Sequence, residues 1–513
     1  MINNTMVRKM LLQETAAVHR TVGSPALLTA LGVLMITVMA LFTAPYVGMA
    51  DNGDFFRSIY SNGLYFNAPD YDAQYFGYFV KQYGIYQYFN ENGATLGSSQ
   101  SLFIKLAIGL NKLLFSSQVF DIRFQAAMYT IVYVLAVYLL IEGITWKLPR
   151  RQGIIIAILA IFIFGDTGYT AYFNSFYSES LVLIMMIFVF ASWLLLYRKR
   201  YNDYVLLGLF VISSIILTTS KQQNAPVGIL IACMAVSLIW VRKDKLFRLL
   251  TLCSIVLMMI AGIVTYLNIS KEFVNINQYH SMTRGVLKGS ANPETTLKSF
   301  GIDEQYSLLK DSIYYEQYGT VDVHSPLLEE SFYSKYGFGS ILKFYVTHPD
   351  KLSSILNEAA QNAFTIKPAA MGNYEQSAGK AFGQQSHFFS VYSLLKDKLA
   401  PKTFGFIVLW MIVVIGLYMP SFVTAVKFGD FRGMQKMVLI LTAMGIGLSG
   451  ILVSIIGAGD ADISKHEFLF TLSFDLVSLL TLSSVISRFF ANSKLPVKGP
   501  AVPYVKAEKG VSI

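Results

Sequence analysis

Cysteine, histidine and charge are scarce in this 513-residue chain, which has two cysteines, six histidines and only 14% charged residues against 54% hydrophobic ones. So little charge excludes a soluble protein of this length and indicates that the membrane is its solvent. Cys233 and Cys253 both fall in apolar runs, so we expect no disulfide framework and interpret the thiols as small packing groups. The chain has no Walker loop, zinc-type Cys/His spacing or Gly-x-Ser-x-Gly elbow, so no enzyme class built on those motifs is indicated.

Long apolar runs are the main feature of the sequence. A transmembrane helix needs roughly 17 to 25 apolar residues, and the first such run follows a basic segment but lacks a small-x-small cleavage site, so it is interpreted as an uncleaved span. The sequence therefore predicts an all-α polytopic membrane protein with about ten transmembrane helices. The ten windows are 26–46, 124–146, 153–164, 180–197, 204–219, 225–241, 246–267, 404–426, 437–456 and 468–490.

The basic residues give an orientation. The formal net charge is +10, but Lys and Arg cluster in every second short connection, as the positive-inside rule requires of cytoplasmic loops, so nucleic acid is not an implied partner. We expect a multi-pass protein of the cell membrane, embedded in the lipid bilayer, with both termini in the cytoplasm. Its parts would be a cytoplasmic N-terminus 1–25, spans one to seven in 26–267 with an external loop 47–123, an external segment 268–402, spans eight to ten in 403–490, and a cytoplasmic tail 491–513.

Two long external segments hold most of the polar sequence, and the short connections 165–179, 220–224 and 457–467 would share their side of the membrane. Residues 101–116 read as an amphipathic helix in the interface plane. A second interfacial pattern occupies 349–364, with Pro349 at its start, after a shorter one at 338–345. The stretch 271–336 is polar and reads as loop.

Directly after the first span come Asp51 and Asp54, in the sequence Ala-Asp-Asn-Gly-Asp-Phe. At the start of a helix, residues three apart face the same way, so both carboxylates can point at one reacting group. The structural alternative is that Asp51 caps an interfacial helix. Both interpretations stand on this motif alone.

Further polar candidates lie in the short external connections. Asp166 and Glu179 are carboxylates close to membrane depth, where charge is costly and usually functional, although Glu179 also fits a capping role. Lys221 is the one charge of its short connection and suits a lipid phosphate, or else the C-terminal dipole of the preceding helix. Other phosphate-binding candidates are Arg57, Arg284, Lys465 and His466. The turn 457–462, which contains two aspartates, is weak evidence for a divalent cation.

Taken together, these features resemble the GT-C superfamily of membrane glycosyltransferases. Members share many spans, a long first external loop that opens with an acidic motif, and interfacial helices within that loop. The sequences at 50–55, 172–179 and 220–224 are similar to those of bacterial hexose transferases of surface-glycan assembly, which build S-layer and secondary cell-wall polymers. Asp51 and Asp54 are spaced, whereas many GT-C members have an adjacent acidic pair, so the resemblance leaves open which aspartate is the base.

The resemblance implies transfer of a hexose from a polyprenyl-phosphate donor to a cell-surface glycan or lipid-linked acceptor, on the external face. Asp51 or Asp54 would take the acceptor proton, while Lys221, with Arg57 or Arg284, would hold the departing phosphate. No cofactor is expected, and a metal requirement is unsupported. The partners would be the donor lipid, the glycan acceptor and the bilayer.

Two other functions compete with this one. A flippase or transporter of lipid-linked sugars would carry ionisable residues in mid-span and paired broken helices. The predicted spans contain few charges, Asp475 and Glu142 among them, while other carboxylates gather near the external ends, which favours surface chemistry. A glycan ligase or polymerase stays open as a second enzymatic alternative.

Overall fold

The computed structural model describes residues 23–87, 97–316, 318–461 and 463–492. Nine helices in these residues are long and apolar enough to cross a membrane. A tenth span is broken: α7 (Arg150–Phe164) is followed, at a bend of 46°, by α8 (Thr167–Thr170) and η1 (Ala171–Asn174). The all-α polytopic fold with about ten spans is confirmed, and the bend explains why the third apolar window is short.

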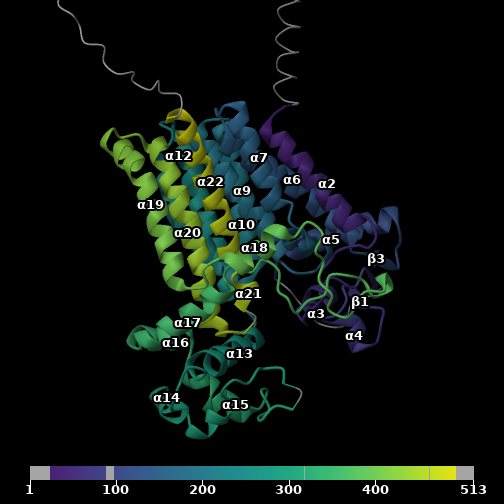
Figure 1. Cartoon of the computed structure of the whole chain (residues 1–513). Coiled ribbons are helices and arrows are strands. Elements are labelled where there is room, and N and C mark those ends of the chain that lie inside the picture. The colour runs from purple at the N-terminus through teal and green to yellow at the C-terminus, as the bar shows by residue number, and fades with distance from the viewer. Residues whose placement is uncertain (1–22, 88–96, 317, 462, 493–513) are drawn as a thin grey trace, which may run out of the picture.

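The spans form a bundle around one buried helix (Figure 1). α9 (Glu179–Arg198) is the most enclosed, and it packs against α6, α10, α20 and α22. The full set is α2 (Pro25–Phe42), α6 (Arg123–Thr145), α7, α9, α10 (Asp203–Ser220), α11 (Ala225–Ala235) with η2 (Gln222–Asn224) and η3 (Val236–Trp240), α12 (Lys245–Leu267), α19 (Phe404–Lys427), α20 (Phe431–Ala458) and α22 (Phe468–Asn492).

The first external segment is more structured than the sequence indicated. It contains α3 (Phe55–Tyr60), α4 (Tyr71–Gln74) and α5 (Gln100–Leu114), which confirms the helix predicted at 101–116. It also forms an antiparallel sheet in the order β1-β2-β3, from Leu64–Phe66, Gln82–Ile85 and Val119–Asp121. These strands are too short to show an alternating pattern in the sequence.

In the second external segment, the prediction that 271–336 forms a loop is wrong. Short helices form there instead, because Ser270, Asn292 and Ser325 each cap a helix start, the last two followed by proline at the first helical position. They pack into a hydrophobic core, rich in buried tyrosine and phenylalanine, which they share with residues 341–364 and the adjoining ends of α19, α20 and α22. The elements are α13 (Lys271–His280), η4 (Ser281–Val286), α14 (Pro293–Ser299), η5 (Glu304–Leu309), α15 (Pro326–Ser331) and η6 (Tyr333–Lys335).

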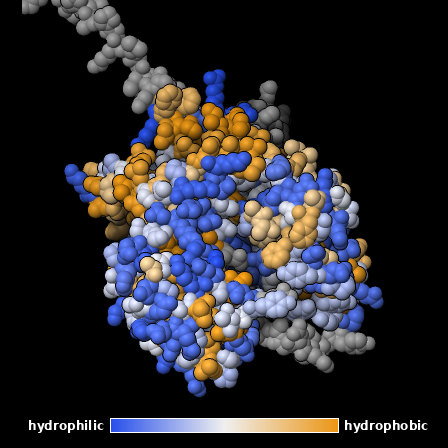
Figure 2. Space-filling model, turned by 60° about the horizontal axis from the view of Figure 1, so that its bottom comes forward, coloured by the Kyte–Doolittle hydropathy of each residue, from blue (hydrophilic) through white to orange (hydrophobic). Residues whose placement is uncertain are grey.

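Three further helices lead from this segment to α19, and a fourth lies in a short connection of the bundle. α16 (Phe338–Thr347) and α17 (Pro349–Asn362) appear as predicted, with Pro349 as the first residue of α17. α18 (Val391–Leu399) precedes α19, and α21 (Ile463–His466) lies in the short connection before α22. Hydrophilic side chains cover this end of the molecule, which is hollowed between its two lobes, and hydrophobic ones cover the bundle (Figure 2).

Cys233 and Cys253 are exposed on α11 and α12, so the prediction that they are packing groups is wrong; they lie on outward helix faces, where hydropathy alone does not distinguish lipid from protein neighbours. The predicted cytoplasmic segments 1–25 and 491–513 fall almost entirely outside the described residues.

Candidate functional site

Asp51 lies where the chain leaves α2, and only 2% of the residue is exposed. Its Oδ1 accepts the N–H of Gly53 at 2.8 Å and the N–H of Phe55 at 3.1 Å, which holds the turn into α3. Gly53 has φ 102°, a left-handed conformation that suits glycine at this turn. The other oxygen, Oδ2, is buried and has no hydrogen-bond partner among the described residues. One oxygen of Asp51 thus binds backbone N–H groups at the start of α3, and the other is left without a partner.

Burial raises the pKa of Asp51 from its usual value to about 7. The neighbouring charge of Asp54 raises the pKa further, while the N–H groups of Phe55 and Gly53 and the more distant Lys465 oppose the shift. A carboxyl that ionises near neutrality is suited to take a proton and return it.

Asp54, three residues later, forms an ion pair with Lys465 of α21. The Asp54 side chain is 51% exposed, whereas that of Lys465 is only 4% exposed. Desolvation would raise the pKa of Asp54, but the charge of Lys465 and its hydrogen bond, with a smaller contribution from the charge of Lys221, lower it to about 2. Asp54 is thus a permanent anion that holds a buried ammonium beside the first external loop.

Tyr177, which sequence reasoning did not single out, fixes this segment. Its hydroxyl accepts the N–H of Asn52 at 2.9 Å and lies 3.0 Å from the carbonyl of Ala50, and its ring packs edge-on against Phe55 at 4.5 Å. The Lys465 ammonium lies 5.3 Å from the same ring. The only sequence signal was its place in the aromatic run before Glu179.

Glu179 and Lys221 form an ion pair at 2.8 Å, with side chains 3% and 22% exposed. Lys221 also acts electrostatically on Asp54, so both predicted residues belong to this cluster. The pairing explains why each occurs close to the bundle: the Lys221 charge offsets the desolvation of the Glu179 carboxylate.

His466 joins the cluster as a neutral group. Its Nδ1 lies 2.5 Å from Oε1 of Gln223, and its carbonyl accepts the Nε2–H of Gln223 at 3.2 Å, so α21 docks on the connection between α10 and α11. Burial lowers the pKa of His466 well below its usual value, and the charges of Lys221 and Lys465 lower it further. A neutral imidazole donates or accepts a hydrogen bond to a ligand but adds no positive charge.

Arg57, on α3, reaches across to the second external segment. Its guanidinium lies 3.3 Å from the ring centroid of Phe273 on α13 and interacts with Tyr315, Asp54 and Glu272. The contact joins the two external segments at the edge of the cluster.

Two predicted site residues make their contacts elsewhere. Asp166 is fully buried and caps α8: its oxygens accept the N–H of Gly168 at 2.7 Å and the N–H of Ser393 at 2.9 Å. Arg284 binds Asp460 through two bonds of 2.7 and 2.8 Å. Asp166 and Arg284 therefore serve to join structural elements.

The turn 457–462 was the weak candidate for a divalent cation. The Asp460 carboxylate is engaged by Arg284 and also by Lys288, so two cations already neutralise it. Asp462 lies outside the described residues.

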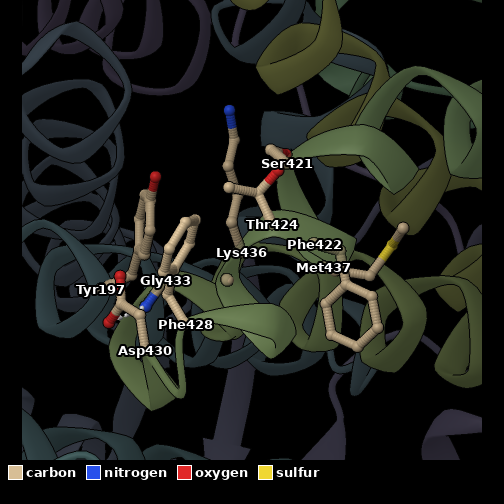
Figure 3. A pocket seen from close by; sticks show the side chains of 10 residues that line it. Tyr197, Ser421, Phe422, Thr424, Phe428, Asp430, Gly433, Lys436 and Met437 are labelled. Atoms are coloured by element: carbon tan, nitrogen blue, oxygen red, sulfur yellow. Dashed lines mark hydrogen bonds between the residues drawn. The ribbon is translucent and has the colours of Figure 1, made fainter.

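The structure has two cavities whose lining includes neither Asp51 nor Asp54. One of about 250 Å³ is lined by residues of α13, of α15 and of the chain around Tyr314. Another of about 230 Å³ lies at the opposite end of the bundle, between α9, α19 and α20 (Figure 3). The candidate site is therefore a polar cluster at one end of the bundle, defined by its side-chain contacts and not by a cavity.

Comparison with known families agrees with the architecture. The family described as YfdI N-terminal transmembrane domain matches residues 11–499. The chain belongs to this family. No curated protein matches the chain. The family description establishes a membrane protein and names no reaction.

Proposed function

We propose that this protein is a membrane glycosyltransferase of the GT-C type, which moves a hexose from a polyprenyl-phosphate donor to a cell-surface glycan or lipid-linked acceptor. The observation that supports this most is the unpartnered Oδ2 of Asp51, in a carboxyl with a pKa of about 7, close to a cluster of cations. A buried polar atom without a partner in a folded protein calls for a functional explanation.

In the proposed reaction, negative charge develops on the departing phosphate, where the cations of the cluster can stabilise it. The acceptor oxygen forms a bond to the anomeric carbon, the bond from that carbon to the donor phosphate breaks, and the acceptor proton passes to Asp51 Oδ2. The departing phosphate gains negative charge, which Lys465, Lys221 and Arg57 are positioned to stabilise. Asp54 holds Lys465 in place and is the second candidate for the base.

The buried position of Asp51 sets a requirement on the substrate. The acceptor hydroxyl must enter the turn 51–55 to reach Oδ2, or binding must open that turn. Catalytic hydrogen bonds in unliganded enzymes are often incomplete and form only in the substrate complex. We place this site on the external face, as the positive-inside distribution of lysine and arginine predicts.

Asp51→Asn tests the proposal because it keeps the shape of the carboxyl and one capping oxygen while it removes basicity. With purified protein and a radiolabelled polyprenyl-phosphate hexose, we expect transfer to fall by about 10²- to 10⁴-fold while the donor still binds. Asp121→Asn is a control for loss of a buried carboxylate in the same external segment, because Asp121 pairs with Arg123 outside the cluster. Wild-type transfer by Asp51→Asn would remove Asp51 from catalysis, and donor binding without transfer by the wild-type protein would favour a flippase.

A further inference from the structure

The bundle end opposite the candidate site contains a second charged arrangement. Arg198 at the end of α9 and Arg488 in the last turns of α22 each act electrostatically on Lys436, in the second turn of α20, and on the hydroxyl of Tyr418. We call these three residues the basic cluster. They lie near the end where the described chain begins and ends (Figure 1).

The cations of the basic cluster have no carboxylate partner within the part of the chain that the structure describes. Ion pairs at the same end use other residues: Arg200 pairs with Glu142 at 2.6 Å, and Arg432 with Asp203 at 2.7 Å. The Arg198 side chain donates its Nε–H to a backbone carbonyl at 3.2 Å. The charges of Arg198 and Arg488 both repel the Lys436 ammonium, and a bound anion would relieve that repulsion.

Helix dipoles do not account for Lys436. Cations are favoured at the C-terminal ends of helices, which suits Arg198 and Arg488, but Lys436 lies near the N-terminal end of α20, where the dipole opposes a cation. The Lys436 ammonium donates to Ser484 Oγ at 3.1 Å and lies 4.5 Å from the Tyr418 ring centroid. An ammonium has three N–H donors, so this contact leaves two for a ligand.

A cavity of about 230 Å³ adjoins Lys436. Its wall includes Tyr197 of α9, Ser421 and Thr424 of α19, and Asp430 before α20 (Figure 3). Asp430 is the one carboxylate in that wall; it accepts the N–H of Gly433 at 2.9 Å and points away from the Lys436 ammonium in Figure 3.

The outer side of the cavity is formed by the helix least enclosed by protein. Only 17% of the most apolar stretch of α19 is buried inside the protein. Met419 and Val423 on this helix are 41% and 55% exposed. Lipid chains can therefore lie along α19 while a headgroup occupies the cavity. Basic pockets between transmembrane helices are known sites for anionic headgroups.

We propose that the basic cluster and the adjoining cavity form a binding site for a phosphate group, carried by the headgroup of an anionic lipid. The site is separate from the cluster around Asp51 and does not depend on the proposed transferase activity. Its ligand is a phosphate diester with acyl chains that pack on α19, and a soluble phosphate is the other source of the same chemistry.

Native mass spectrometry of the full-length protein in detergent tests this, with phosphatidylglycerol and phosphatidylcholine offered in equal amounts. We expect the wild-type protein to retain phosphatidylglycerol about tenfold better, which corresponds to about 1.4 kcal/mol. Lys436→Gln should abolish the preference and Lys436→Arg should keep most of it. Lys427→Gln, in the last turn of α19 and outside the cavity wall, should keep all of it.

Thermal unfolding provides the second measurement and separates the two phosphate sources. If inorganic phosphate stabilises the delipidated wild-type protein as much as phosphatidylglycerol does, and Lys436→Gln removes both effects, the site is upheld with a soluble ligand. Equal retention of the two lipids by the wild-type protein, without stabilisation by phosphate, would overturn the proposal. If Lys436→Gln folds poorly, Arg198→Gln replaces it, with the same expected loss of preference.

Discussion

Asp51 and Asp54 differ in their surroundings although only two residues separate them. Asp51 is buried, so its pKa lies near neutrality, whereas Asp54 is half exposed and paired with Lys465, so its pKa is about 2. The two carboxylates are therefore suited to different tasks, one to proton transfer and one to fixing a cation.

The pH dependence of transfer should report Asp51. The base must be ionised, so we expect kcat/KM to be low below pH 7 and to rise as the pH passes the Asp51 pKa of about 7. Asp54→Asn removes a neighbouring negative charge and releases Lys465 from its ion pair, and both changes favour ionised Asp51. The acid limb of the profile should therefore move to lower pH in any residual activity of Asp54→Asn; an unmoved limb would show that Asp51 is not the titrating group.

Lys221→Gln should lower both donor affinity and thermal stability, because it removes a phosphate-binding cation and leaves the buried Glu179 carboxylate unpaired. The double variant Lys221→Gln with Glu179→Gln separates the two effects: stability should recover and donor affinity should not. Binding of radiolabelled donor and thermal unfolding in detergent provide the two readouts. Recovery of both in the double variant would assign Lys221 to structure alone.

At the scale of elements, α18 is tied to the bundle by a buried polar network centred on Asp475 of α22. The Asp475 carboxylate accepts the hydroxyl of Tyr169, the hydroxyl of Tyr392 and the ammonium of Lys396, each at 2.6 Å. Lys396 and Asp475 have side chains 4% and 0% exposed. Asp475 is one of the ionisable residues within the predicted spans, where a transporter would carry such residues, and it is paired with Lys396.

Loss of one partner of this pair should be costly because it leaves a buried charge uncompensated. We expect Lys396→Met to lower the free energy of unfolding by about 3 to 5 kcal/mol. Lys398→Met, on the exposed side of the same helix, should have little effect. Denaturant unfolding in micelles measures both, and equal stability of the two variants would show that the ion pair does not anchor α18.

At the scale of the whole molecule, the bundle separates two polar ends. The cluster around Asp51, together with both external segments, lies at one end, and the basic cluster lies at the other with the described chain ends (Figure 1). The charge distribution predicts that the first end faces outward.

Impermeant thiol labelling in intact cells tests this orientation. Single cysteines at Asn67 and Ala291, both exposed, should be labelled, and those at Lys199 and Lys243, also exposed, should be protected until the cells are opened. Cys233 and Cys253 must first be changed to serine because both are exposed on the bundle surface. The reverse labelling pattern would place the Asp51 cluster in the cytoplasm and contradict the proposed use of an external donor.

The sequence by itself determined the spans and the helices α5, α16 and α17. It also showed the third span as a short apolar window, which the structure explains by a bend after α7. Hydropathy determines these because a membrane helix satisfies its backbone hydrogen bonds internally, whatever its neighbours. It also pointed to Asp51, Asp54, Glu179 and Lys221, because charge near a membrane is rare enough to be noticed.

Only the tertiary structure decided which of these charges meet. Lys465 reaches Asp54 across 411 residues, Lys221 is paired with Glu179, and Asp166 and Arg284 are held in structural contacts. The segment 271–336, expected as a loop, is helical and packs into an aromatic core that it shares with residues 341–364 and the ends of bundle helices. Pairing, burial and hence the pKa of a carboxyl depend on neighbours that are distant in the sequence, and a pattern of residue types along one chain does not contain those distances.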